Sequence, residues 1–185
     1  AWVAVSIGAI VLFLSWRIPD AKQFLIATAC GVLLLGVAIL AVLASDAGRE
    51  LLLPRGLSFR PTIWSAALER VVETSVWFGI GIATPEEVIG GGMTFSHPHN
   101  MYLAVFSQGG VVALVLYLVV LWQSIAHLLE SYSEPVAKLA LSILALSLTA
   151  HLLDGHELVE KVGDTWFLIW FPVAVAISLK WRPAE

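Results

Sequence analysis

The feature that most constrains this chain is an apolar run from Met101 to Leu129 that contains no Asp, Glu, Lys or Arg. A helix needs about 20 such residues to cross the hydrocarbon core of a bilayer, so the run predicts a membrane-spanning helix. Composition agrees, because 59% of the residues are hydrophobic and only 13% are charged. Soluble domains have about 25% charged residues. The sequence therefore predicts an integral membrane protein.

Further apolar segments alternate with short polar connections along the rest of the chain. Backbone polar groups must be satisfied inside a bilayer, so each such segment is expected to be helical. Gly31 and Gly36 in the second span favour close helix packing. We therefore expect an all-α fold, a polytopic transmembrane helical bundle forming a single membrane domain. The expected spans are residues 1–16, 23–45, 101–129, 136–153 and 165–179, approximately.

The longest polar connection covers residues 46–99 and contains one further helical pattern. Pro61 favours the first turn of a helix, where its missing N–H costs nothing. Beyond it, apolar residues recur on one face as far as Val76, with Glu69 and Glu73 opposite, which indicates an amphipathic helix. Basic residues are denser in the short connections than in this loop. The positive-inside rule therefore places the loop on the extracytoplasmic side.

Several functional classes are disfavoured by what the sequence lacks. It has no basic patch with interleaved aromatic residues, so we expect no nucleic-acid partner. Cys30 is the single cysteine, which leaves neither a disulfide framework nor a CxxC metal site. The glycine-rich stretch at residues 90–92 lacks the surroundings of a P-loop or a dinucleotide fingerprint, and we expect no cofactor. The chain begins within an apolar segment without signal-peptide features, which is typical of a piece of a longer polytopic protein.

Two histidines and an asparagine lie where the loop meets the span that begins at Met101. Pro98 places the helix start close to His97 and His99. A helix N-terminus carries about half a positive charge and unpaired N–H groups, which favour a neutral imidazole and suit a phosphate. His99 is therefore a candidate general base, with Asn100 as a helix cap or a substrate contact. The alternative is that both histidines are interfacial residues that only form hydrogen bonds.

Arg60 precedes Pro61 at the other predicted helix start, and Arg55 lies five residues earlier. A guanidinium beside a helix N-terminus pairs well with phosphate oxygens, so both arginines are candidate anion ligands. The alternative is anchoring to lipid headgroups.

A polar cluster lies at the end of the fourth span and consists of His151, Asp154, His156 and Glu157. Its spacing matches no strong metal motif, and we expect no metal site. The simplest interpretation is that these polar residues cap the loop at the end of the helix. The functional alternative is that His156 or Asp154 lines a substrate site.

Three motifs follow one another between Leu57 and Leu121. They are Ser58-Phe59-Arg60-Pro61-Thr62-Ile63-Trp64, Phe78-Gly79-Ile80-Gly81 and Ser96-His97-Pro98-His99-Asn100-Met101-Tyr102-Leu103. In this order they resemble the O-antigen ligase and polymerase superfamily of bacterial envelope glycosyltransferases. That family has an arginine before a tryptophan, a Gly-x-Gly, and then His-Asn-x-Tyr-Leu opening a membrane helix. Its glycine turn matches Gln108-Gly109-Gly110, while Ala113 departs from the usual pattern.

The resemblance implies a multi-pass enzyme of the bacterial inner membrane whose active site faces the periplasm. Such an enzyme transfers a glycan from an undecaprenyl-pyrophosphate carrier to an acceptor hydroxyl, here lipid A–core, without metal or nucleotide. His99 matches the family's catalytic histidine, and Arg60 matches an arginine that contacts the pyrophosphate. Another functional arginine of the family falls before Ala1. The further candidate substrate contacts are Arg55, His97, Asn100, Tyr102 and His156.

Other functions stay open at this point. Within the family, the acceptor of an O-antigen or exopolysaccharide polymerase is another carrier-linked chain, and that of a protein O-oligosaccharyltransferase is a protein hydroxyl. A membrane transporter module is the alternative from a different class. Transporters place ionisable groups near the bilayer midplane. Here these groups gather at one face, which favours an interfacial enzyme.

Overall fold

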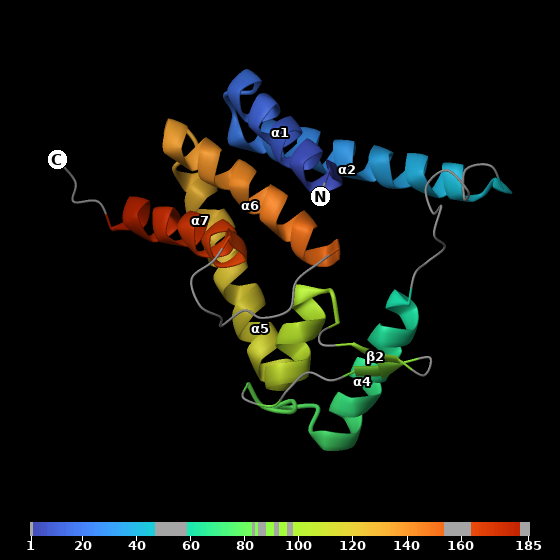
Figure 1. Ribbon diagram of the computed structural model, residues 1–185. Helices are drawn as coiled ribbons and strands as arrows, with labels where there is room; N and C mark the ends of the chain where they lie inside the picture. Colours follow the sequence, from blue (N-terminus) through green and yellow to red (C-terminus); the bar gives the residue numbers. More distant parts are fainter. Residues whose placement is uncertain are drawn as a thin grey trace.

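The structure is a computed structural model, and it describes residues 2–46, 59–82, 84, 88–90, 93–95, 98–153 and 164–181. The described part consists of helices and one hairpin, joined by turns and loops (Figure 1). The helices are α1 (Trp2–Arg17), α2 (Ala21–Leu43), α4 (Arg60–Thr74), α5 (Met101–Glu130), α6 (Pro135–Leu153) and α7 (Asp164–Lys180). The antiparallel hairpin joins β1 (Val88–Gly90) to β2 (Met93–Phe95), with Ile89 opposite Thr94.

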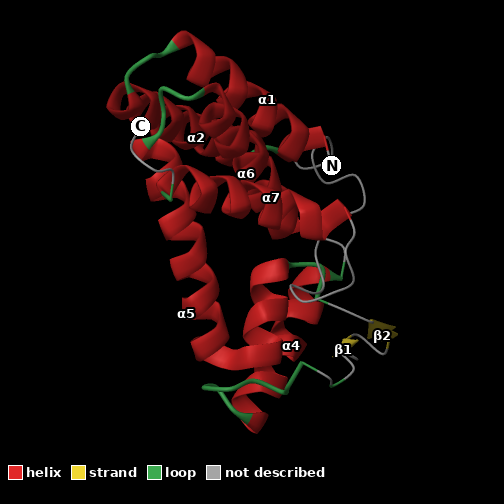
Figure 2. Ribbon diagram, turned by 90° about the vertical axis from the view of Figure 1, so that its left-hand side faces the viewer, coloured by secondary structure: helices red, strands yellow, loops and turns green. Residues whose placement is uncertain are grey.

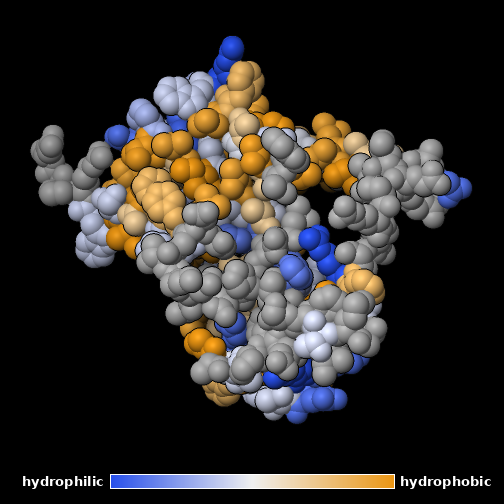
Figure 3. All heavy atoms as spheres, viewed as in Figure 1, coloured by the Kyte–Doolittle hydropathy of each residue, from blue (hydrophilic) through white to orange (hydrophobic). Residues whose placement is uncertain are grey.

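Three of the described helices are long and apolar enough to cross a membrane, namely α2, α5 and α6. Two shorter apolar helices, Val3–Arg17 and Trp166–Lys180, fall within α1 and α7. Hydrophobic residues dominate the end of the molecule built from α1, α2 and α6, and hydrophilic residues gather towards α4 (Figure 3). The prediction of an all-α, polytopic membrane protein is therefore confirmed.

Close packing in the bundle occurs at a glycine that the sequence analysis did not single out. A Cβ added at Gly8 of α1 would lie 2.8 Å from the Cβ of Leu146 on α6. At Gly31 and Gly36 of α2, where close packing was predicted, an added Cβ would meet nothing within 4 Å. The missing side chain therefore brings helices together at Gly8 and not on α2.

A tyrosine in the turn after α5 ties this turn to the end of α1. The hydroxyl of Tyr132 lies 2.9 Å from the carbonyl oxygen of Ile18 and 3.1 Å from that of Ser15. Burial and the charge of Asp20 raise the pKa of Tyr132, so its hydroxyl remains a hydrogen-bond donor at neutral pH. The ring packs against Phe24 of α2, with 5.0 Å between ring centroids. One buried side chain thus joins three helices.

Helix α5 consists of two legs separated by a break at Gly110, where φ is 65° and ψ is −162°. Tyr102 on the first leg and Tyr117 on the second have ring centroids only 6.0 Å apart. In a straight helix, 1.5 Å of rise per residue would separate them by roughly 22 Å. The first leg therefore folds back along the second, as Figures 1 and 2 show. The sequence predicted one span over residues 101–129 without this reversal.

Candidate active site at two helix starts

Arg60 is the first residue of α4, and Pro61 lies in the first turn, as predicted. Phe59 precedes the helix and supplies no side-chain cap, so N–H groups of the first turn keep their hydrogen-bonding capacity. Ile63, Ala67 and Val71 are the buried residues of the helix. Other members of the predicted apolar face stay exposed; these are Leu68, Val72 and Val76. The start of α4 thus combines a guanidinium with the N-terminus of a helix.

A hydrogen bond joins the first turn of α4 to the residues before α5. The indole Nε1–H of Trp64 donates to the carbonyl oxygen of Pro98 over 2.9 Å. Pro98 is fully buried, so this bond satisfies a carbonyl that water does not reach. Trp64 lies one helical turn after Arg60, and Pro98 directly precedes His99. The bond therefore brings together the two chain segments that carry Arg60 and His99.

His99 occupies a left-handed backbone conformation, with φ of 52°, which is uncommon for a residue other than glycine. It directly precedes Asn100, the N-cap of α5, whose side-chain oxygen accepts from the Leu103 N–H over 3.0 Å. His99 is partly exposed, as a residue that meets a substrate must be. The strained turn projects it at the start of the first leg of α5.

Helix α6 holds the start of α5 from the other side. The side-chain amide of Asn100 donates to the carbonyl oxygen of Leu152 over 3.2 Å. The hydroxyl of Tyr102 donates to the carbonyl oxygen of Leu148, also over 3.2 Å. Both acceptors belong to the last turns of α6. The polar groups of Asn100 and Tyr102 thus have structural partners within the protein.

At its other end, the first leg of α5 meets the loop that follows α4. The N–H groups of Ile80 and Gly81 donate to the carbonyl oxygens of Ser107 and Gln108 over 2.8 and 2.9 Å. In the opposite direction, the N–H groups of Val111 and Val112 donate to loop carbonyls over 2.9 and 3.3 Å; these acceptors are Val76 and Trp77. The loop thereby satisfies backbone groups that the break in α5 leaves without helical partners.

These contacts define the relative direction of α4 and the first leg of α5. Their starts meet at the Trp64–Pro98 hydrogen bond, and their ends meet through the loop after α4. The two helices therefore run parallel, with both N-termini at the same end. Each N-terminus carries about half a positive charge, and Arg60 adds a full one. Such a concentration of positive potential favours an anion between the two helix starts.

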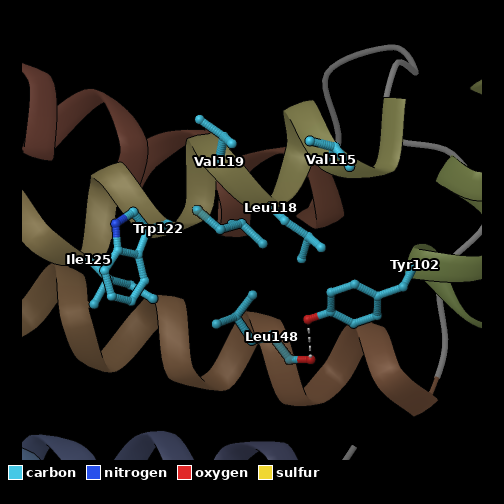
Figure 4. Close-up of a pocket in the computed structure, with 8 residues that line it drawn as sticks. Tyr102, Val115, Leu118, Val119, Trp122, Ile125 and Leu148 are labelled. Atoms are coloured by element: carbon cyan, nitrogen blue, oxygen red, sulfur yellow. Dashed lines mark hydrogen bonds between the residues drawn. The ribbon is translucent and has the colours of Figure 1, made fainter. Parts of the chain in front are cut away.

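Two apolar cavities adjoin this end of the molecule. One, of about 430 Å³, lies between α4 and both legs of α5; its lining includes Trp64, Asn100 and Phe106. The other, of about 530 Å³, lies between the second leg of α5 and α6, and it is lined by Leu118, Trp122 and Leu148 among others (Figure 4). Tyr102 lines both cavities. Their walls suit hydrocarbon and not sugar, because almost every lining side chain is apolar.

The predicted residues divide into two groups. Arg60, His99, Asn100 and Tyr102 belong to elements that the structure brings together at the two helix starts. Arg55, His97 and His156 lie outside the described residues, as do Asp154 and Glu157. No group of metal-binding side chains is found in the described part of the chain.

His151, the first member of the polar cluster predicted at the end of the fourth span, lies in the last turn of α6 and is buried. Its Nδ1 lies 3.1 Å from the hydroxyl of Ser147, one turn earlier. Sequence reasoning missed the structural roles of Trp64, Gly79 and Gly110. These residues were noted only as members of an amphipathic helix or of the motifs above, and neither feature indicates a partner 30 or more residues away.

Comparison with known proteins shows the family of this chain. Residues 1–118 match the family model described as O-antigen ligase. Over 131 residues, or 70% of this chain, the sequence is 33% identical to an O-antigen ligase of Pseudomonas aeruginosa strain PAO1. The aligned part covers 32% of that relative, so the chain spans about a third of its length. No solved structure matches the chain. On the family match over most of its length and on this relative, the chain belongs to the O-antigen ligase family.

Proposed function

We propose that this chain carries the catalytic residues of a glycosyltransferase of the O-antigen ligase type. The enzyme moves a glycan from an undecaprenyl-pyrophosphate carrier to a hydroxyl of lipid A–core, at the periplasmic face of the inner membrane. One observation carries the proposal. In a chain of this family, the structure pairs two parallel helix starts, one beginning with Arg60 and the other preceded by His99.

The pyrophosphate of the donor would lie at the paired helix starts. Negative charge grows on its bridging oxygen as the bond to the sugar breaks, and preorganised donors stabilise that charge. Arg60 supplies a guanidinium with a planar fork of N–H groups, which matches phosphate oxygens better than a lysine would. The uncapped first turn of α4 supplies backbone N–H groups beside it. The apolar cavities next to the site suit the hydrocarbon part of an amphiphilic donor.

His99 acts as the general base. Its neutral imidazole takes the proton of the acceptor hydroxyl while the acceptor oxygen attacks the anomeric carbon of the sugar. The bond from that carbon to the pyrophosphate oxygen breaks, and the departing pyrophosphate keeps the electron pair. Attack from the face opposite the leaving group inverts the configuration of the anomeric carbon. Much of the rate enhancement then comes from holding the two substrates in line.

The other predicted substrate contacts complete this proposal. Asn100 and Tyr102 line the cavity between α4 and α5, next to the reacting groups. Arg55, His97 and His156 are proposed to contact substrate from segments outside the described residues. The polymerase and the protein O-oligosaccharyltransferase use the same chemistry on another acceptor. We place the ligase first because the relative compared above is an O-antigen ligase.

The decisive experiment replaces the base and observes lipopolysaccharide by electrophoresis in a strain that lacks the chromosomal gene. His99→Ala is expected to abolish the O-antigen ladder and leave the polymer on its lipid carrier. His127→Ala is the matched control, because His127 lies near the other end of the same helix, where it pairs with Glu130. A normal ladder with His99→Ala would disprove the assignment of the base. Core bearing a single repeat in the deletion strain would indicate a polymerase instead.

A further inference from the structure

The loop after α4 crosses α5 at its break, where Gly79 lies against Gly110. We infer that these two glycines are positioning residues, because this backbone crossing determines where His99 lies relative to Arg60. Neither residue touches the reacting groups in the proposed mechanism. The effect of this placement on catalysis rests on the proposed function. The position of the first leg of α5 can be measured without an activity assay, so the inference and the proposed function can be tested separately.

The crossing requires glycine at both positions. A Cβ at Gly79 would fall 2.7 Å from the backbone nitrogen of Gly110 and nearer still to a carbonyl oxygen of the same helix. A Cβ at Gly110 would overlap backbone atoms of Trp77. Backbone atoms cannot move aside as a flexible side chain can. Both glycines also have positive φ, and the φ/ψ combination at Gly110 is essentially restricted to glycine.

The crossing also compensates for the break in α5. A helix that ends in an apolar environment leaves carbonyl and N–H groups unsatisfied, and each costs several kcal/mol there. Two hydrogen bonds run from the loop to the first leg, and two run from the second leg to the loop. The break and the loop therefore depend on each other. If the loop cannot approach, the least costly alternative for α5 is to continue as one helix.

The consequence for the site is a large displacement of His99. The first leg holds about nine residues, and at 1.5 Å of rise each it is roughly 14 Å long. If α5 continued straight, this leg would point away from the second leg instead of folding back along it. His99 would then leave the start of α4, because the Trp64–Pro98 hydrogen bond and the packing of Leu103 against α4 both need the first leg in its present place. Arg60 lies on α4, whose main contacts among the described elements are with α5 and β1, so His99 and Arg60 would no longer lie together.

The test compares four glycine variants of the full-length enzyme in membrane vesicles. Gly110→Ala and Gly79→Ala are expected to lower kcat about 100-fold, because His99 is then misplaced relative to Arg60. Gly81→Ala is the first control, since it introduces a side chain at positive φ in the same loop without a backbone clash. Gly36→Ala is the second, because an added Cβ there meets nothing within 4 Å. Gly36→Ala is expected to transfer at close to the parent rate, and Gly81→Ala, which is strained at its positive φ, is expected to lose far less activity than Gly79→Ala.

A cross-link reports the placement directly. Leu68 on α4 and Leu103 on the first leg of α5 line the same cavity. With the single native cysteine removed as Cys30→Ser, a Leu68→Cys and Leu103→Cys pair is expected to react with a short bifunctional thiol reagent. Adding Gly110→Ala or Gly79→Ala is expected to abolish the cross-link in protein that still elutes as a monodisperse peak. Gly81→Ala and Gly36→Ala are expected to retain it.

The outcomes separate the two ideas. A cross-link that persists in both Gly110→Ala and Gly79→Ala would overturn the inference, whatever happens to transfer. Loss of the cross-link with parent-level transfer would also overturn it, because the placement would then have no bearing on catalysis. His99→Ala in the same assay tests the proposed function by itself. If that variant were active, the role of His99 would fail, and the cross-link would still show whether the crossing places the helix.

Discussion

At the scale of one residue, Asn100 caps the first turn of α5, links that turn to α6 and lies next to the proposed site. Its oxygen accepts from Leu103 and closes the first turn of α5, and its amide donates to Leu152 and fixes α6 against that turn. The sequence allowed two roles for this residue, a helix cap or a substrate contact. The cap follows from local chemistry that the sequence contains. The bond to Leu152 depends on the fold and could not have been predicted.

These two bonds lead to a prediction that separates stability from activity. Asn100→Ala loses both bonds, and loss of a cap costs about 1 kcal/mol. Asn100→Asp keeps the capping oxygen, so its melting temperature should lie closer to that of the parent. Its added negative charge, however, repels the proposed pyrophosphate, so transfer should fall in Asn100→Asp as well. Thermal unfolding in detergent and the transfer assay check this pair, and full transfer by Asn100→Asp would argue against an anion at this helix start.

At the scale of elements, hydropathy predicted the helices well because it is a local property. The run from Met101 to Leu129 became α5, and the segment after Pro61 became α4. The break at Gly110 was not predictable in the same way. Two adjacent glycines in an apolar run also fit an unbroken membrane helix. The partner that stabilises the break lies some 30 residues earlier in the chain, around Gly79.

The contact between α1 and α6 gives a second prediction. Gly8→Val places methyl groups where a Cβ alone would already lie 2.8 Å from Leu146. Overpacking of this kind costs typically 1–3 kcal/mol, so the variant should unfold at a lower temperature than the parent. Gly36→Val is the control, and we expect no change, because that position faces open space. Equal melting temperatures for the two variants would show that α1 and α6 do not pack this closely.

At the scale of the whole molecule, the sequence indicated which residues to consider for the site better than how the fold brings their segments together. Arg60 and His99 were singled out from residue type and from their positions at helix starts. Their proximity depends on the Trp64–Pro98 bond and on the reversal of α5, and both are long-range features. The parallel direction of the two helices could not be predicted. A sequence pattern locates the start of a helix and carries no information on where the helix points.

The orientation of the molecule in the membrane gives a third prediction. In the Cys30→Ser background, Thr94→Cys reports on the hairpin side and Ser133→Cys on the turn between α5 and α6. Both residues are exposed in the structure. In intact spheroplasts, a membrane-impermeant maleimide is expected to label Thr94→Cys and spare Ser133→Cys until the cells are lysed. The reverse pattern would place the proposed active site in the cytoplasm and exclude a periplasmic transferase.

The crossing of loop and helix is built from main-chain atoms alone, which has a consequence for how such a protein can change. Apart from the two glycines, its hydrogen bonds place no demand on the side chains of the residues that form them, such as Ile80, Ser107 and Gln108. Exchanges among those side chains that packing tolerates therefore leave the crossing itself intact. The direction of the first leg of α5 can thus be preserved while the sequence around it changes.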